Sequence, residues 1–169
     1  MTALLRERGI PFAVIGAAAM AVHGVSRSTR DVDLLTLAPD CLEESFWPPL
    51  ASPGVEVTIR RGDAEDPLAG VVRFAATGQH PLDLIVGRSA WQAGILQRAR
   101  ETPVDGVPVP VAGRADLIVL KLYAGGPQDA WDITQLLEDP ERAALLVEVE
   151  RALEALPAES RRLWARIVR

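Results

Sequence analysis

The chain has 169 residues, a formal net charge of -5 and a hydrophobic share of 49%. This length favours a single domain over residues 1–169 that buries a proper core, and the hydrophobic share is typical of a globular protein. The negative charge argues against a broad nucleic-acid-binding surface, because phosphate contacts need clustered Lys and Arg. No apolar run approaches the length of a membrane span and no signal-peptide pattern begins the chain, so we expect a cytoplasmic protein.

Strand and helix patterns alternate along the chain, with Pro and Gly between them. In chain order we expect a helix at residues 4–8, strand 12–15, helix 17–23, strand 32–37, helix 41–47, strands 55–60, 71–75 and 81–86, helix 90–99, a hairpin turn at 104–107 and strand 109–111. The rest is predicted to be helical, with Gly125-Gly126-Pro127 separating two helices. These elements indicate an α/β (α+β) fold, a small twisted mixed sheet with flanking helices.

Two aspartates one residue apart, Asp31 and Asp33, stand at the head of the β-prone run 31–37. Because strand side chains alternate, both carboxylates are expected to project from one face. Mg²⁺ prefers oxygen ligands and is often held by one or two carboxylates together with substrate phosphates. The pair therefore predicts a metal–triphosphate site, although Asp-x-Asp alone also caps helices or lies at solvated strand ends.

The neighbouring residues suit the same chemistry. Gly16 ends the strand 12–15 and, with Ala17, opens the next helix, where backbone N–H groups can meet a phosphate. Arg27 and Arg30 add positive charge before the aspartates. Both arginines are expected either to bind phosphates or to pair with nearby acids.

A third carboxylate, Asp83, lies in the middle of a predicted strand. Leu82, Leu84 and Val86 share one face of that strand, so Asp83 points to the other face. An acid at a strand centre calls for a specific role, and a third metal ligand is such a role.

Taken together, these residues resemble the signature of the DNA-polymerase-β-like nucleotidyltransferase superfamily, particularly the minimal bacterial members related to abortive-infection (AbiE-type) toxins. The first block consists of Gly16, Ala17, His23, Gly24, Arg27, Thr29, Asp31 and Asp33. A second block, residues 116–133, resembles the helix–turn–helix-like stretch of those proteins. With the Asp83 strand, the resemblance covers residues 12–137, most of the chain.

The resemblance implies a reaction and a set of roles. A nucleoside monophosphate would pass from a nucleoside triphosphate to an acceptor hydroxyl of RNA, protein or a small molecule, in a toxin–antitoxin or phage-defence system with an antitoxin or cognate protein partner. Asp31 and Asp33 would hold Mg²⁺ or Mn²⁺. Asp83 would be a ligand of the ion next to the acceptor hydroxyl and would help remove the proton of that hydroxyl. The residues implied to bind the nucleotide are Gly16, Ala17, Arg27, Arg30 and Lys121. The supporting residues are His23, Thr29, Asp129 and Asp132.

Two of these residues have a second interpretation from the sequence alone. Lys121 lies on an apolar helical stripe, where an ammonium is costly unless it is paired. It is expected either to reach the nucleotide's phosphates or to form an internal salt bridge with Asp129 or Asp132. His23 before Gly24 fits a helix C-terminus, where an imidazole suits the helix dipole, as well as it fits a catalytic role.

Three departures from the family pattern leave the function open. Ala17 replaces a Gly or Ser, and Gly126 and Gln128 stand where many relatives carry Arg and Lys. The lost charges favour, as an alternative, a catalytically silent nucleotide-binding or regulatory module of the same fold. A further alternative is an antibiotic-modifying nucleotidyltransferase, which should line its acceptor pocket with acids to receive a cationic drug.

Overall fold

The structure is a computed structural model that describes residues 1–26, 31–50 and 53–169. Within these ranges, seven strands form one mixed sheet in the order β3-β4-β5-β2-β1-β7-β6. The strands are β1 (Phe12–Ile15), β2 (Val32–Thr36), β3 (Val55–Arg61), β4 (Leu68–Ala76), β5 (Leu82–Gly87), β6 (Arg100–Val104) and β7 (Val107–Val111). The α-helices are α1 (Thr2–Glu7), α2 (Gly16–Val22), α3 (Gln92–Arg98), α4 (Arg114–Ala124), α5 (Asp129–Leu136), α6 (Arg142–Ala152) and α7 (Ala158–Ile167).

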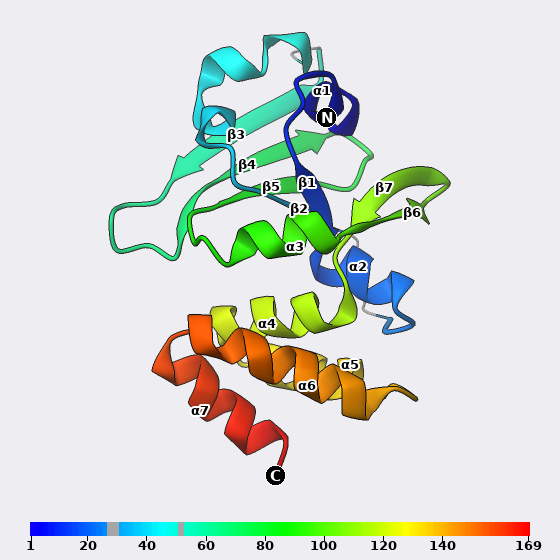
Figure 1. The fold of residues 1–169 in the computed structure, drawn as a ribbon. Coiled ribbons are helices and arrows are strands. Elements are labelled where there is room, and N and C mark those ends of the chain that lie inside the picture. Colours follow the sequence, from blue (N-terminus) through cyan, green and yellow to red (C-terminus); the bar gives the residue numbers. More distant parts are fainter. Residues whose placement is uncertain (27–30, 51–52) are drawn as a thin grey trace.

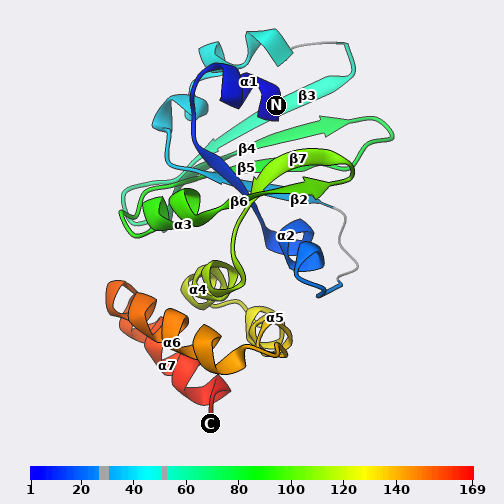
Figure 2. The ribbon, with the colours of Figure 1, turned by 45° about the vertical axis from the view of Figure 1, so that its right-hand side comes forward.

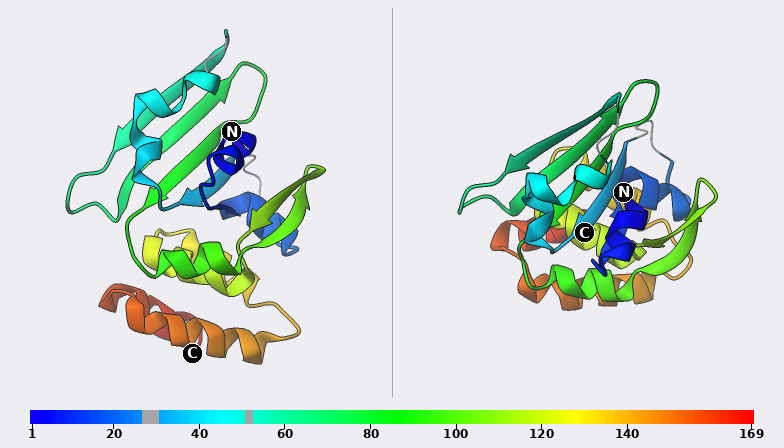
Figure 3. Two further views of the ribbon diagram at one scale, coloured as in Figure 1. Left: turned by 45° about the horizontal axis from the view of Figure 1, so that its top comes forward. Right: turned by 90° about the horizontal axis from the view of Figure 1, so that it is seen from above.

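The centre of the sheet mixes the two strand directions. β1 runs antiparallel to β2, whereas β2 is parallel to β5 and β1 is parallel to β7. The outer pairs β3–β4 and β6–β7 are antiparallel and lie on either side of β1 and β2 (Figure 3). The expected fold class, a mixed sheet with flanking helices, is therefore confirmed.

Helices α4–α7 gather on one side of the sheet, and α1 lies on the other side (Figures 1 and 2). Contacts between α2 and both β1 and β2, and between α2 and α4, connect the sheet to this helical layer. None of the described helices is both long and apolar enough to span a bilayer.

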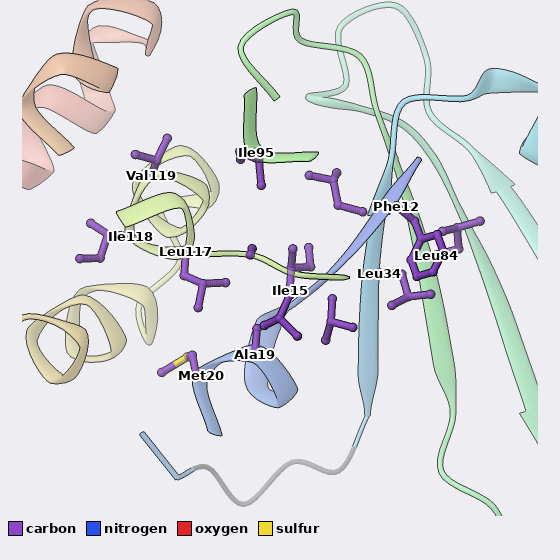
Figure 4. Close-up of a cluster of buried hydrophobic side chains, with 14 of the residues drawn as sticks. Phe12, Ile15, Ala19, Met20, Leu34, Leu84, Ile95, Leu117, Ile118 and Val119 are labelled. Atoms are coloured by element: carbon purple, nitrogen blue, oxygen red, sulfur yellow. The ribbon is translucent and has the colours of Figure 1, made fainter. Parts of the chain in front are cut away.

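Apolar side chains fill the space between the sheet and α4. Figure 4 places Ile15 of β1 and Met20 of α2 near Leu117 of α4, and all three residues are buried. Ile15 is paired in register with Asp33 on β2, so both side chains point to the face of the sheet that carries α4. Asp33 therefore lies on the face of the sheet that α4 covers.

Several sequence predictions are confirmed closely. The strand at 12–15 has the expected bounds, and the turn at Asp105-Gly106 has positive φ at both residues, as a two-residue hairpin requires. Helix α4 ends at Gly125 in the left-handed conformation, with φ 65°.

The helix predicted at residues 41–47 is wrong. This segment forms short 3-10 turns, and Glu43 between two of them has an extended backbone with ψ 131°. The indole N–H of Trp47 donates to the carbonyl of Cys41 at 2.8 Å, and Pro48 begins the next turn. Cys41 and Trp47 are nonetheless buried in the hydrophobic core.

Candidate active site

Two acidic side chains lie next to each other on neighbouring parallel strands. Asp33 of β2 is in register with Asp83 of β5, and Asp83 is in register with Arg73 of β4. Residues that are directly opposite in a sheet share a face, and adjacent strands lie about 4.8 Å apart. The sheet therefore carries a row of carboxylate, carboxylate and guanidinium.

Asp31 adds a third carboxylate to this row. It immediately precedes β2, two residues before Asp33, and its Oδ2 lies 3.8 Å from the Arg73 guanidinium. Arg73 also donates from Nη1 to Asp83 Oδ2 at 2.9 Å. The structure thus brings together the three aspartates that the sequence singled out, and Arg73 lies between Asp31 and Asp83.

Arg73 is the member of this group that sequence reasoning missed. It lies in the β-prone run 71–75, where a charged residue at a strand centre is as unexpected as Asp83 is in its own strand. The same argument from alternation would have placed Arg73 on one face of its strand. Only the register between β4 and β5 shows that this is the face of Asp83.

Gly16 makes room for Asp33. Its φ is +62°, a backbone conformation that residues other than glycine rarely adopt. A Cβ at this position would lie 2.1 Å from Asp33 Oδ2. The glycine that the sequence placed at the strand-to-helix turn therefore lies directly against the Asp33 carboxylate. Ala17 follows it in the first turn of α2.

The environment of Asp33 disfavours its charged form. Burial is the main cause, and the negative charges of Asp83 and Asp31 add to it, raising the pKa of Asp33 from 3.8 to about 6. The positive charges of Lys121 and Arg73 act in the opposite direction and compensate only in part. A bound cation would favour the charged form of Asp33.

Asp83 also has an unsatisfied oxygen. Its Oδ2 accepts from Arg73, but Oδ1 is buried and has no hydrogen-bond partner among the described residues. A buried polar atom without a partner is costly and uncommon in folded proteins. Such an atom next to a second carboxylate suits a ligand that brings positive charge.

Lys121 lies in an ion-paired cluster between α4 and α5. Its ammonium donates to Asp129 Oδ1 at 3.1 Å and also to Asp132 Oδ2. Asp129 accepts a further hydrogen bond from the backbone N–H of Gly126 at 2.7 Å. Asp132 is fully buried, so this cluster holds the two helices together.

His23 takes part in contacts at the far end of α2. Its Nε2 donates to the carbonyl of Ala112 at 2.9 Å, and its own carbonyl accepts from Arg114 at 2.6 Å. Along α2, His23 lies about 10 Å from Gly16, at 1.5 Å per residue. Arg27, Thr29 and Arg30, also singled out by sequence, lie outside the described residues.

The carboxylates fit a hard divalent cation by their chemistry. Asp31, Asp33 and Asp83 offer oxygen donors, the type that Mg²⁺ and Mn²⁺ prefer, and the Asp83 Oδ1 atom has no other partner. No group of three His, Cys, Asp or Glu side chains in the described part of the chain is close enough together to hold a metal ion. The guanidinium of Arg73 contacts both Asp31 and Asp83.

A large cavity elsewhere offers no comparable group. It measures about 1150 Å³ and is lined by residues of α3, α4 and α6. Its most buried acid, Asp116, is paired with Arg98 at 2.5 Å, and Arg114 is paired with Asp139 at 2.9 Å. These charged residues satisfy one another, so the cavity does not compete with the carboxylate row as a candidate active site.

No protein-family model and no curated protein matches the chain. Among solved structures, the chain is similar to the antibiotic-resistance factor ANT(2'')-Ia, with 20% identity, coverage of 98% of this chain and 86% of that chain, and a TM-score of 0.48. It is also similar to an antigenic nucleotidyltransferase-like protein from Paracoccidioides brasiliensis, with 18% identity, coverage of 92% and 89%, and a TM-score of 0.49. At this sequence identity and TM-score, the similarity concerns the fold and says nothing about the activity of this chain.

Proposed function

We propose that the chain is a metal-dependent nucleotidyltransferase, which moves a nucleoside monophosphate from a nucleoside triphosphate to an acceptor hydroxyl. The observation that carries the proposal is the in-register pair Asp33 and Asp83, with Asp31 joined to the same group through Arg73. The raised pKa of Asp33 and the unpartnered Oδ1 of Asp83 support it, because a bound cation would stabilise the charged form of Asp33 and could accept Oδ1 as a ligand.

The three carboxylates would divide the work. Asp31 and Asp33 would hold the cation that accompanies the triphosphate, and Asp83 would hold the cation next to the acceptor hydroxyl and help remove the proton of that hydroxyl. A bound Mg²⁺ or Mn²⁺ supplies Lewis-acid stabilisation of the charge that develops on the phosphoryl oxygens. Gly16 contributes by leaving the space that the Asp33 carboxylate occupies.

The other residues would act on the nucleotide or in support. The phosphate-binding residues of the proposal are Gly16, Ala17, Arg27, Arg30 and Lys121. Lys121 would need to give up at least one of its two carboxylate partners to do so, because both contacts are formed in the structure. His23, Thr29, Asp129 and Asp132 would support the site from a distance.

The acceptor defines the biological setting of the proposal. RNA or protein as acceptor would fit an AbiE-type toxin with an antitoxin or cognate partner, and a small molecule would fit an antibiotic-modifying enzyme. One solved structure of ANT(2'')-Ia holds adenylyl-2''-tobramycin, so tobramycin belongs in the panel of acceptors. A silent nucleotide-binding or regulatory module would label no acceptor.

The test is transfer of label from each nucleoside triphosphate to separate acceptors: cell lysate, total tRNA and aminoglycosides. We expect one combination to retain label and release pyrophosphate with Mg²⁺ or Mn²⁺ present. Asp83→Asn should lose nearly all transfer while still binding nucleotide, because Asp83 is needed where charge changes on the attacking oxygen. Glu56→Gln is the matched control, since Glu56 is an exposed acid on β3 of the same sheet.

Two results would contradict the proposal in different ways. Nucleotide binding without label on any acceptor would favour the silent module. Full transfer activity in Asp83→Asn would remove Asp83 from the reaction while leaving the class of reaction intact.

A further inference from the structure

Arg73 occupies the atoms that a cation in the proposed site would use. Its guanidinium donates to Asp83 Oδ2 at 2.9 Å and lies 3.8 Å from Asp31 Oδ2. Two of the three carboxylates are therefore in contact with the positive charge of Arg73. A guanidinium cannot deprotonate at ordinary pH, so Arg73 cannot give up its charge and has to move instead.

Arg73 is freer to move than Asp83. Its side chain is 44% exposed, whereas that of Asp83 is 18% exposed. The long Arg side chain can turn toward solvent without opening the core, because it projects from the sheet surface. Withdrawal of Arg73 would leave both oxygens of Asp83 available for a ligand.

A divalent cation and Arg73 would repel each other at such short range. Like charges a few ångströms apart in a partly buried site oppose each other strongly. The phosphates of a nucleotide would relieve this opposition, because they bring negative charge and match the planar fork of a guanidinium. Arg73 would then exchange a carboxylate partner for a phosphate partner.

We infer that Arg73 is a displaceable counter-ion, which competes with a divalent cation for Asp83 and binds the phosphates of a nucleoside triphosphate once displaced. The inference rests on the proposed function. It means that cation and nucleotide bind with positive coupling, each raising the affinity for the other by the same factor. Arg73 thereby keeps the site from holding a cation tightly before the nucleotide arrives.

The test is the affinity for Mn²⁺ without nucleotide, measured from the electron paramagnetic resonance signal of free Mn²⁺. We expect Arg73→Gln to bind Mn²⁺ about tenfold more tightly than the wild type, within the usual range of coupling between sites. The same variant should bind nucleoside triphosphate more weakly at saturating Mn²⁺, because the phosphates lose their guanidinium partner. A residue that merely supports the fold would produce the opposite change in Mn²⁺ affinity or none.

Arg60→Gln is the matched control. Arg60 is an exposed arginine on β3 whose register partner Val71 lies two residues before Arg73, so it projects from the same face. Its substitution changes the net charge of the protein by the same amount as Arg73→Gln. We expect the Mn²⁺ affinity of Arg60→Gln to equal that of the wild type.

The outcomes separate this inference from the proposed function. If Arg73→Gln binds Mn²⁺ no more tightly than the wild type, while the wild type binds Mn²⁺ and transfers label, the counter-ion inference alone is overturned. If neither protein binds Mn²⁺ even with nucleotide present, both are overturned.

A variant that does not fold without metal is also informative. If Arg73→Gln is unfolded in chelator and folds at Mn²⁺ concentrations that leave the wild type metal-free, the inference is supported. If Mn²⁺ never restores its fold, and Arg73→Lys folds with wild-type Mn²⁺ and nucleotide affinities, the inference is overturned.

Discussion

The acids on the sheet and the acids on α5 differ in how their charge is balanced. On α5, Asp129 and Asp132 both accept from Lys121, and Asp129 also accepts from a backbone N–H. On the sheet, Arg73 contacts both Asp83 and Asp31, and the pKa of Asp33 is raised because of burial and the neighbouring carboxylates. Each acid of the helical cluster thus contacts Lys121 directly, whereas the sheet gathers three carboxylates around Arg73 and raises the pKa of Asp33.

The largest effect is expected in the helical cluster. Lys121→Met removes the ammonium that contacts Asp132, whose carboxylate is fully buried. Breaking a buried pair by removing one partner costs about 3–5 kcal/mol. Urea unfolding should therefore show a loss of this size in the free energy of unfolding.

The control for Lys121→Met is a substitution in an ion pair that is exposed to solvent. Arg162 and Glu159 form an ion pair on α7 with side chains that are 69% and 76% exposed. Arg162→Met should cost less than about 1 kcal/mol. A stable Lys121→Met protein with weakened nucleotide binding would break the comparison, because it would assign Lys121 to the phosphates.

The next effect is a gain of stability on the sheet. The folded-state pKa of Asp33, about 6, lies above the ordinary value of 3.8. The contribution of this group to stability is therefore fully present below pH 3.8 and is lost as the pH rises through about 6. Asp33→Asn in chelator at pH 7.5 should raise the free energy of unfolding by about 2–3 kcal/mol, at about 1.4 kcal/mol for each pKa unit.

The pH dependence makes this prediction specific. The advantage of Asp33→Asn over the wild type should shrink as the pH falls through about 6 and vanish well below pH 3.8, where the wild-type carboxyl is protonated in both the folded and the unfolded states. Glu56→Gln, on the exposed edge strand β3, should give no such dependence. A loss of stability in Asp33→Asn at pH 7.5 would show that the sheet cluster is balanced after all.

Sequence alone identified the parts of the site that depend on one strand or one turn. The alternation in residues 81–86 predicted that Asp83 and Leu84 point to opposite faces of the same strand. In the structure Leu84 is fully buried, and Asp83 points to the other face. The glycine at the turn after residues 12–15 lies where it was expected. These features follow from the two-residue alternation of a strand and from the preference of a tight turn for glycine, and both can be recognised in the sequence.

The role of Arg73 could not be predicted because it depends on strand order. β4 and β5 are joined by a short turn, but which residue of β4 faces Asp83 is fixed by the register of the pair. A shift of one residue would turn Arg73 to the opposite face. The contacts between Lys121 and α5 likewise depend on how α4 and α5 pack. The sequence therefore left two alternatives for Lys121, the phosphates of a nucleotide or an internal salt bridge.

The smallest effect is expected from Gly16→Ala, which tests the close contact between the Gly16 backbone and the Asp33 carboxylate. Gly16→Ala has to adopt a left-handed φ of +62°, which costs about 1–2 kcal/mol. It also has to displace the Asp33 carboxylate, because its Cβ would lie 2.1 Å from Oδ2. We therefore expect a loss of stability by urea unfolding, together with a weaker rise of the melting temperature on addition of Mn²⁺.

Gly24→Ala separates the two causes. Gly24 has a φ of +81°, yet nothing lies within 4 Å of the Cβ that alanine would add. The two variants share the backbone strain, and only Gly16→Ala moves the Asp33 carboxylate. A reduced response to Mn²⁺ in Gly16→Ala alone would show that the position of this carboxylate, and not the fold as such, determines cation binding. Equal responses in both variants would mean that the contact between Gly16 and Asp33 has no part in the site.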